Sequence, residues 1–178
     1  MKSPYDGIPT DKWEQKTKEL IEKYPLTPDY LVHVVLRSWD SILQTKIADR
    51  LSIATDVRPK PQIMGFFLHE VIAYTIQMDL PSEWRKEKTA DDKDVVCIAD
   101  PNLSLEIKTS SHKNRIFGNR SYAQETITDK KSKSSYYLAV NFEPFDDEGN
   151  IPKITLVRFG WIDHTDWVGQ SAASGQQA

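Results

Sequence analysis

The sequence predicts an α+β fold in which a central mixed β-sheet is flanked by helices, an α/β/α-like arrangement. Helical periodicity dominates the first 80 residues, and short runs rich in β-branched and aromatic residues follow it. A chain of 178 residues has the size of one domain with an ordinary hydrophobic core. We therefore expect one domain over residues 1–168, with a helical part at 1–80 and a sheet part at 81–168.

Three helices are expected in the helical part. Residues 11–24 have an amphipathic pattern. The Thr-Pro-Asp segment at 27–29 supplies an N-cap, a first-position proline and a first-turn acid, so a second helix begins there and reaches the early forties. Residues 63–78 form a long apolar run whose length favours a buried helix over a strand. A further helical turn or two is expected at 45–53.

The sheet part contains four short runs that are typical of strands, at residues 94–98, 103–109, 136–142 and 154–162. A polar segment at 110–133 separates the second run from the third, and a helix is expected within it near 122–128. Residues 169–178 are rich in Gly, Ser and Gln and have little to bury, so we expect a disordered tail there.

The composition is that of a globular protein of the cytoplasm. Hydrophobic residues make up 39% and charged residues 28% of the chain, which is ordinary for such proteins. No stretch approaches the roughly 18 apolar residues that cross a bilayer, and the first residues lack the apolar run of a signal peptide. The single cysteine excludes an internal disulfide framework and a cysteine-rich zinc site. We expect a cytoplasmic protein with no membrane partner.

The predicted hairpin between the first two strands brings three charged side chains together. Asp94 opens the first strand, and Glu106 and Lys108 lie two residues apart on the second. Because successive strand side chains alternate between faces, Glu106 and Lys108 share one face, while Leu105 and Ile107 point into the core. Two carboxylates beside an ammonium group suit Mg²⁺ held against a phosphodiester, so a nuclease is the leading hypothesis.

Each of these residues has a predicted role. Asp94 and Glu106 are expected to be metal ligands, and the carbonyl oxygen of Ile107 is expected to add a third. Lys108 is expected to orient the attacking water or to stabilise the negative charge that develops. The alternative is that Glu106 and Lys108 form only a solvent-exposed ion pair, which is common on strands.

Glu70 is a further candidate for the active site. It is the only acid in the apolar run at 63–78, and a glutamate there is costly to bury unless it is paired or bound to a metal. Either it approaches the metal, directly or through water, or it lies on the exposed stripe of its helix. We take His69 beside it as structural.

A basic segment follows the predicted site. Between residues 108 and 133 there are seven basic and two acidic side chains, a local charge of +5 in a chain of net charge −3. The remainder therefore carries −8, so the total charge argues against a nucleic-acid binder, whereas its distribution favours one. The alternative is a solvated loop in which charges cluster by chance.

The residues around the predicted site resemble a known superfamily of nucleases. Asp94 followed by Glu106-Ile-Lys108 resembles the D…(D/E)xK signature of the PD-(D/E)XK nucleases, although Lys93 rather than proline precedes the aspartate. The segments SLEIKTSSHKNRIFGNRSYAQ at 104–124 and FGWIDHTDW at 159–167 resemble type II restriction endonucleases. Together with PKPQIMGFFLHE at 59–70, the pattern is most similar to the ScaI-like group.

This resemblance implies a restriction-endonuclease-like core with a Mg²⁺-dependent active site in which Mn²⁺ can substitute. It also implies a homodimer that cuts both strands of double-stranded DNA at a short palindromic site, because two-fold symmetry in the protein mirrors that of the site. A host with such an enzyme needs a DNA methyltransferase of matching specificity.

Donor-rich side chains just past the predicted catalytic strand are expected to contact DNA. Arg pairs well with guanine, and Asn or Gln with adenine, in the major groove, whereas other contacts reach only phosphate. The expected DNA-contacting residues are Lys113, Asn114, Arg115, Asn119, Arg120, Ser121, Gln124, Lys130 and Lys131.

Two other functions fit the same residues. A repair nuclease or junction resolvase of the same fold would share the metal site but recognise DNA structure instead of sequence. A DNA-binding or scaffold protein would carry the Glu106 and Lys108 pair without catalysis.

Overall fold

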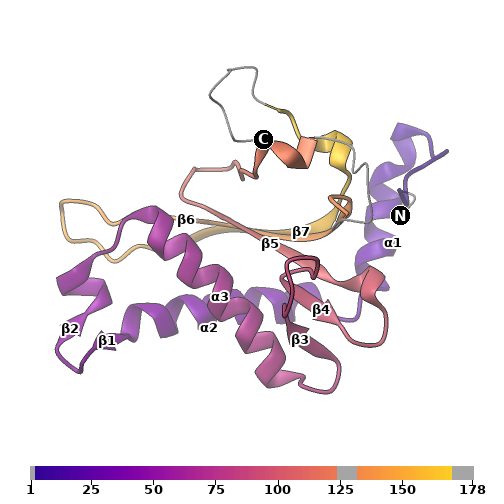
Figure 1. The fold of residues 1–178 in the computed structure, drawn as a ribbon. Coiled ribbons are helices and arrows are strands. Elements are labelled where there is room, and N and C mark those ends of the chain that lie inside the picture. Colours follow the sequence, from indigo (N-terminus) through magenta and orange to yellow (C-terminus); the bar gives the residue numbers. More distant parts are fainter. Residues whose placement is uncertain (1–2, 124–131, 170–178) are drawn as a thin grey trace.

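The computed structural model describes residues 3–123 and 132–169, and its centre is a five-stranded mixed sheet. The strand order is β3-β4-β5-β6-β7, and all neighbours are antiparallel except β5 and β6, which are parallel (Figure 1). The strands are β3 (Trp84–Lys86), β4 (Val95–Cys97), β5 (Leu105–Ser110), β6 (Ser135–Phe142) and β7 (Ile154–Ile162). The predicted α+β class with a central mixed sheet is confirmed.

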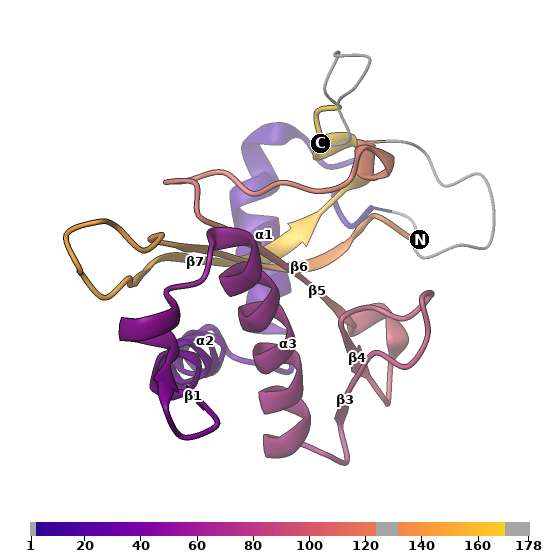
Figure 2. The same cartoon turned by 60° about the vertical axis from the view of Figure 1, so that its left-hand side comes forward.

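Three α-helices precede the sheet, as predicted: α1 (Trp13–Glu22), α2 (Pro28–Gln44) and α3 (Pro61–Asp79). Thr27 caps α2, because its side chain accepts a hydrogen bond from the Tyr30 amide at 3.2 Å. Helices α2 and α3 pack side by side against one face of the sheet, and α1 contacts β7 (Figure 2). No helix in the described residues is long and apolar enough to cross a membrane.

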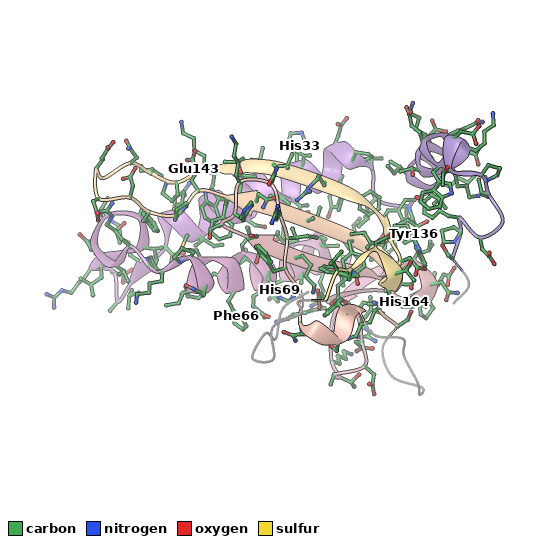
Figure 3. The ribbon with its side chains drawn as sticks, turned by 90° about the horizontal axis from the view of Figure 1, so that it is seen from above. His33, Phe66, His69, Tyr136, Glu143 and His164 are labelled. Carbon is green, nitrogen blue, oxygen red and sulfur yellow. The ribbon has the colours of Figure 1, made fainter. Side chains whose placement is uncertain are left out.

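Helix α3 is buried on one side only. Leu68 and Ile72 are fully buried against the sheet, whereas Phe66, Tyr74 and Met78 are each more than half exposed. Figure 3 shows Phe66 pointing outward from this helix. The expectation of a helix at 63–78 is therefore confirmed, but its apolar run covers both a core face and an exposed face.

The expected helical turns at 45–53 are wrong. This segment forms a small antiparallel hairpin, β1 (Lys46–Ile47) with β2 (Leu51–Ser52), followed by the short helix η2 (Ile53–Val57). Ala48 and Asp49 turn the chain with φ of 51° and 55°. Such turns usually carry Asn-Gly, Asp-Gly or Gly-Gly, whereas Asp49 is followed here by Arg50, so no glycine signals the hairpin in the sequence.

The expected strands at 94–98, 103–109, 136–142 and 154–162 are present with small shifts of their ends, and β3 was missed. Strand β3 has only three residues and two of them are charged, so it has no strand-like run. The expected helix near 122–128 is described only over the 3-10 helix η4 (Arg120–Ala123). The rest of that helix, at 124–128, and the expected tail at 170–178 lie outside the described residues.

The two faces of the sheet differ in character. Leu105 and Ile107 are buried in the core that α2 and α3 cover, while Glu106 and Lys108 lie on the other face, where Glu106 is in register with Tyr137. Parallel neighbours need a connection that crosses the sheet, so the segment that leaves β5 must return over one face to reach β6. This crossing segment, described at residues 111–123 and 132–134, passes over the face that carries Glu106 (Figure 1). This topology brings the polar segment to the predicted site.

Truncation of a buried side chain of α3 should destabilise the protein far more than truncation of an exposed one. Leu68→Ala should lower the free energy of unfolding by about 2–5 kcal/mol, because it leaves a cavity in the core. Phe66→Ala, at a side chain that is 67% exposed, should change it by no more than about 1 kcal/mol. Urea unfolding followed by circular dichroism measures both, and equal losses would contradict the packing described here.

Candidate active site

Asp94 is fixed beside strand β5 by a hydrogen bond that replaces strand pairing. The β4–β5 ladder contains a single pair, Val95 with Leu105. Directly past it, Asp94 Oδ2 accepts a hydrogen bond from the amide of Ile107 at 2.6 Å. Asp94 is only 5% exposed, and its carboxylate satisfies a backbone N–H group that has no strand partner on that side. The predicted metal ligands Asp94 and Ile107 are therefore in direct contact.

Glu106 is a buried carboxylate surrounded by donors. Its side chain is 2% exposed, and Oε1 accepts hydrogen bonds from Lys108 Nζ at 2.9 Å and from the hydroxyl of Tyr122. Lys93 Nζ lies 3.7 Å from Oε2. Removing a carboxylate from water costs several kcal/mol unless charges and hydrogen bonds compensate for it. The Glu106–Lys108 pair is thus an enclosed pair, not a solvent-exposed one.

Lys93 occupies the position at which the superfamily signature has proline. Besides its approach to Glu106, its ammonium donates to the carbonyl oxygen of Ser132 and lies 5.9 Å from the ring centroid of Tyr137. The departure from the signature therefore adds a second cation to the surroundings of the buried carboxylate.

Helix α3 supplies His69 and Glu70 to the same region. His69 Nε2 is 3.1 Å from Asp94 Oδ2, and its Nδ1 is 3.3 Å from Glu70 Oε1. Glu70 also forms an ion pair with Lys86 of β3. His69, which the sequence analysis takes as structural, thus lies between Glu70 and a predicted metal ligand. The signal available in the sequence was the adjacent His-Glu pair within an otherwise apolar run.

The charges around His69 and Glu70 shift both groups. Burial lowers the pKa of His69, but the hydrogen bond and charge of Asp94 outweigh it, so the net shift is upward. Burial raises the pKa of Glu70, but Lys86 and then His69 outweigh it, so the net shift is downward. Both shifts favour the charged forms, which is the expected result for alternating acids and bases in contact.

Two carboxylates and one backbone carbonyl are the donor set that the sequence predicts for a metal. No cluster of three or more His, Cys, Asp and Glu side chains in the described residues is arranged to hold a metal ion. Mg²⁺ usually takes only one or two protein carboxylates and completes its shell with water and phosphate oxygens. That requirement fits the set of Asp94, Glu106 and the Ile107 carbonyl oxygen. Lys108 Nζ donates a hydrogen bond to this carbonyl oxygen at 3.2 Å.

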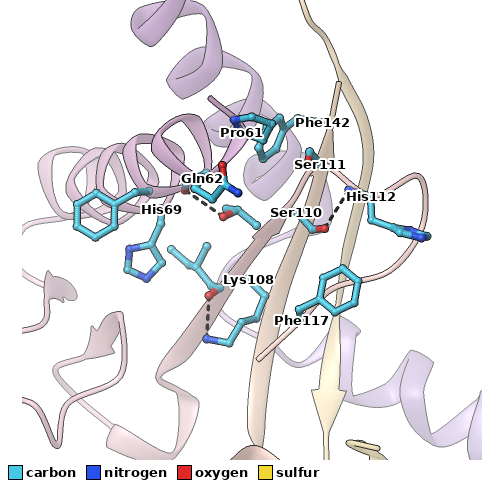
Figure 4. A pocket seen from close by; sticks show the side chains of 13 residues that line it. Pro61, Gln62, His69, Lys108, Ser110, Ser111, His112, Phe117 and Phe142 are labelled. Atoms are coloured by element: carbon cyan, nitrogen blue, oxygen red, sulfur yellow. Dashed lines mark hydrogen bonds between the residues drawn. The ribbon is translucent and has the colours of Figure 1, made fainter. Parts of the chain in front are cut away.

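A cavity of about 710 Å³ opens beside these residues. Its walls come from α3, from β5 and from the start of the crossing segment, and they include His69, Lys108 and His112 (Figure 4). The hydroxyl of Thr109 donates to the carbonyl oxygen of Gly65 at 3.0 Å, which joins β5 to α3 at the back of the cavity. The cavity therefore gives an external ligand access to Lys108.

The start of the crossing segment is tied to the sheet through Asn141. This residue is fully buried on β6, and its amide donates to the carbonyl oxygens of His112 at 2.7 Å and Arg115 at 2.8 Å. Arg158 of β7 donates to its side-chain oxygen at 2.8 Å. The backbone at 112–115 is thereby held against a rigid strand.

Most of the predicted DNA-contacting residues that the structure describes are exposed on this segment, namely Lys113, Asn114, Arg115, Asn119 and Ser121. The backbone of Arg120 lies in η4. Gln124, Lys130 and Lys131 lie outside the described residues.

The chain is similar to a known family of proteins over nearly its whole length. Residues 3–178 match the family model for the ScaI restriction endonuclease. The chain belongs to this family. It is also 45% identical, over 178 residues, to the type II restriction enzyme ScaI of Streptomyces caespitosus, and the match covers 99% of this chain and 78% of that protein. No solved structure matches the chain.

Membership of the ScaI restriction endonuclease family confirms the predicted resemblance and the predicted class of enzyme, a restriction endonuclease. A repair nuclease or a DNA-binding scaffold protein would belong to a different family, so the match disfavours both hypotheses. The match also covers the segments at 59–70, 104–124 and 159–167 on which the resemblance was based.

The ion pair between Glu70 and Lys86 gives a prediction for pH dependence. Lys86→Met should raise the pKa of Glu70, whereas Arg85→Met should leave it unchanged, because Arg85 pairs with Asp92 instead. In the native protein the pKa of Glu70 is below its unfolded value. The pair therefore stabilises the fold above that unfolded value, and this contribution disappears as the pH falls through the folded value. Carboxyl titration by NMR measures the shift, and an unchanged Glu70 in Lys86→Met would refute the pairing.

Proposed function

We propose that this member of the ScaI restriction endonuclease family is a Mg²⁺-dependent type II endonuclease that hydrolyses double-stranded DNA at a short palindromic site. The observation that carries the proposal is the enclosed group of Asp94, Glu106 and Lys108 at the β4–β5 junction, beside a cavity open to a ligand. An ion pair with a purely structural role does not require a second buried carboxylate beside it.

Asp94, Glu106 and the Ile107 carbonyl would hold Mg²⁺, and Mn²⁺ would substitute for it. When bound, the cation supplies Lewis-acid activation of the phosphodiester. Hydrolysis forms a bond from a water oxygen to phosphorus and breaks the bond to one deoxyribose oxygen, which takes up a proton. Lys108 Nζ, anchored between Glu106 and Ile107, would orient the water or stabilise the charge that develops on the phosphate.

His69 and Glu70 would act behind these groups. The hydrogen bond from His69 to Asp94 would orient the carboxylate, and Glu70, held by Lys86, would orient His69. Outer-shell partners of this kind tune metal ligands in many sites. Glu70 is thus assigned to the active site through His69, without a direct contact to the metal.

The crossing segment would provide the DNA contacts. Lys113, Asn114 and Arg115 are exposed and directly follow His112, which lines the cavity beside Lys108. A phosphate backbone over the site would therefore meet them. Asn119, Arg120, Ser121, Gln124, Lys130 and Lys131 complete the proposed DNA-contacting residues.

We assign a homodimer to the active form, because cutting both strands of a palindrome needs two sites related by two-fold symmetry. A matching DNA methyltransferase would protect the host DNA, and the cytoplasm, where that DNA lies, would be the site of action.

Removal of either charged partner at the site should abolish cleavage. Glu106→Gln and Lys108→Ala should each reduce plasmid cleavage in Mg²⁺ at least about a hundredfold, because each removes charge where the transition state needs it. Glu14→Gln and Lys18→Ala are matched controls, since they break an exposed pair of the same type on α1, and both should cleave normally. Gel electrophoresis of digested plasmid provides the measurement.

The pattern of products separates the proposed function from its alternatives. Discrete bands from the wild-type protein support a restriction enzyme. Smeared products or preferential cutting of branched DNA would indicate a structure-specific nuclease, and a mobility shift without cleavage in any divalent cation would indicate a binding protein. If both Glu106→Gln and Lys108→Ala still cleave DNA, the proposed active site is wrong.

Removal of a cation that binds phosphate should weaken the salt dependence of DNA binding. Lys113→Ala or Arg115→Ala should each reduce the slope of log affinity against log salt by about one unit, because one fewer phosphate is neutralised. Lys23→Ala at the end of α1 should not change the slope. Fluorescence anisotropy with a labelled duplex in EDTA measures this without cleavage. An unchanged slope for both variants would exclude these residues from the DNA surface.

A further inference from the structure

Tyr122 connects the proposed DNA-contacting segment to the buried carboxylate of the site. It lies in η4, at the end of the described part of the crossing segment, between Ser121 and Ala123. Its hydroxyl donates to Glu106 Oε1, the same oxygen that accepts from Lys108 Nζ. Through this hydrogen bond, η4 reaches a proposed metal ligand directly.

The ring of Tyr122 is held as firmly as its hydroxyl. It packs against Trp167 with ring centroids 5.1 Å apart, in a small hydrophobic cluster with Tyr137 on the second face of the sheet. A Cβ atom added at Gly118 would lie 3.1 Å from this ring and 3.2 Å from Trp167, so glycine permits the close approach. The Tyr122 ring therefore packs closely against both Gly118 and Trp167.

Two ammonium groups face the same ring. Lys108 Nζ is 4.7 Å and Lys133 Nζ is 4.4 Å from its centroid, within the range of cation–π attraction. Tyr122 thus contacts the proposed catalytic lysine through its ring and the proposed metal ligand through its hydroxyl. A shift of η4 would change both contacts together.

We propose that Tyr122 is a positioning residue that couples DNA contact on the 111–123 segment to metal binding at Glu106. Its hydroxyl orients the Glu106 carboxylate for the cation, and its backbone is directly continuous with Ser121, one of the residues proposed to meet DNA. Coupling of this kind is reciprocal, so DNA tightens metal binding and metal tightens DNA binding by the same factor. The inference rests on the proposed metal site.

The first test is metal affinity without DNA. Titration with Mn²⁺ followed by electron paramagnetic resonance should show binding that is about 10–100-fold weaker in Tyr122→Phe than in the wild type, the usual effect of losing an outer-shell partner. Tyr137→Phe is the matched control, because it removes a hydroxyl from the same cluster that donates to the Lys133 carbonyl oxygen instead of to Glu106. It should bind Mn²⁺ like the wild type.

A second variant moves the ring and keeps the hydroxyl. Gly118→Ala should weaken Mn²⁺ binding as well, because the added methyl group displaces Tyr122 or Trp167 by a few tenths of an ångström. In both variants, the Mg²⁺ concentration for half-maximal cleavage should rise by a larger factor than the cleavage rate at saturating Mg²⁺ falls. A purely structural role would instead lower the rate at every Mg²⁺ concentration.

The coupling itself is measured with Ca²⁺ and a labelled duplex. Added Ca²⁺ should strengthen duplex binding by the wild type, and this gain should shrink in Tyr122→Phe and persist in Tyr137→Phe. Equal Mn²⁺ affinity, or an equal Ca²⁺ effect, in Tyr122→Phe and wild type would overturn the role of Tyr122 while leaving the proposed function intact. A wild type that neither binds Mn²⁺ nor cleaves DNA would overturn both.

Discussion

Two carboxylates buried at the β4–β5 junction place the strongest constraint on this molecule. Asp94 and Glu106 are both buried. A buried ionised group loses several kcal/mol of hydration energy unless its surroundings compensate for the loss. The Ile107 amide and His69 compensate Asp94, while Lys108 and Tyr122 compensate Glu106. The donors come from α3, β5 and η4, so these separate elements are positioned around the same buried charge.

The sheet makes this arrangement possible because its faces are divided. One face is apolar and carries the core under α2 and α3, and the other carries Glu106 and Lys108 with an aromatic cluster beside them. The parallel pairing of β5 with β6 sends the chain across that second face, and the Asn141 side chain holds the crossing backbone in place. Sites built on strands in this way are more rigid than sites built on loops alone.

Family membership and geometry bear on different questions. The family match concerns nearly the whole chain and identifies the class of enzyme. The geometry concerns a few atoms and suggests a role for each group. A backbone amide fixes the carboxylate of Asp94, a lysine and a tyrosine both donate to Glu106, and His69 lies between two acids. The position of Lys93, where the superfamily signature has proline, is compatible with the site because its ammonium adds positive charge near Glu106.

The sequence by itself determined the α+β class, three helices, four strands, and the hairpin that joins Asp94 to Glu106 and Lys108, because alternation and capping are local signals. It failed at 45–53, where Ala48 and Asp49 adopt positive φ without a glycine to mark the turn, and at the short strand β3. Only the tertiary structure decided that His69 meets Asp94 and that Tyr122 meets Glu106. Those contacts join residues 25 and 16 positions apart. They depend on how a helix and a crossing segment pack on the sheet, which no local pattern encodes.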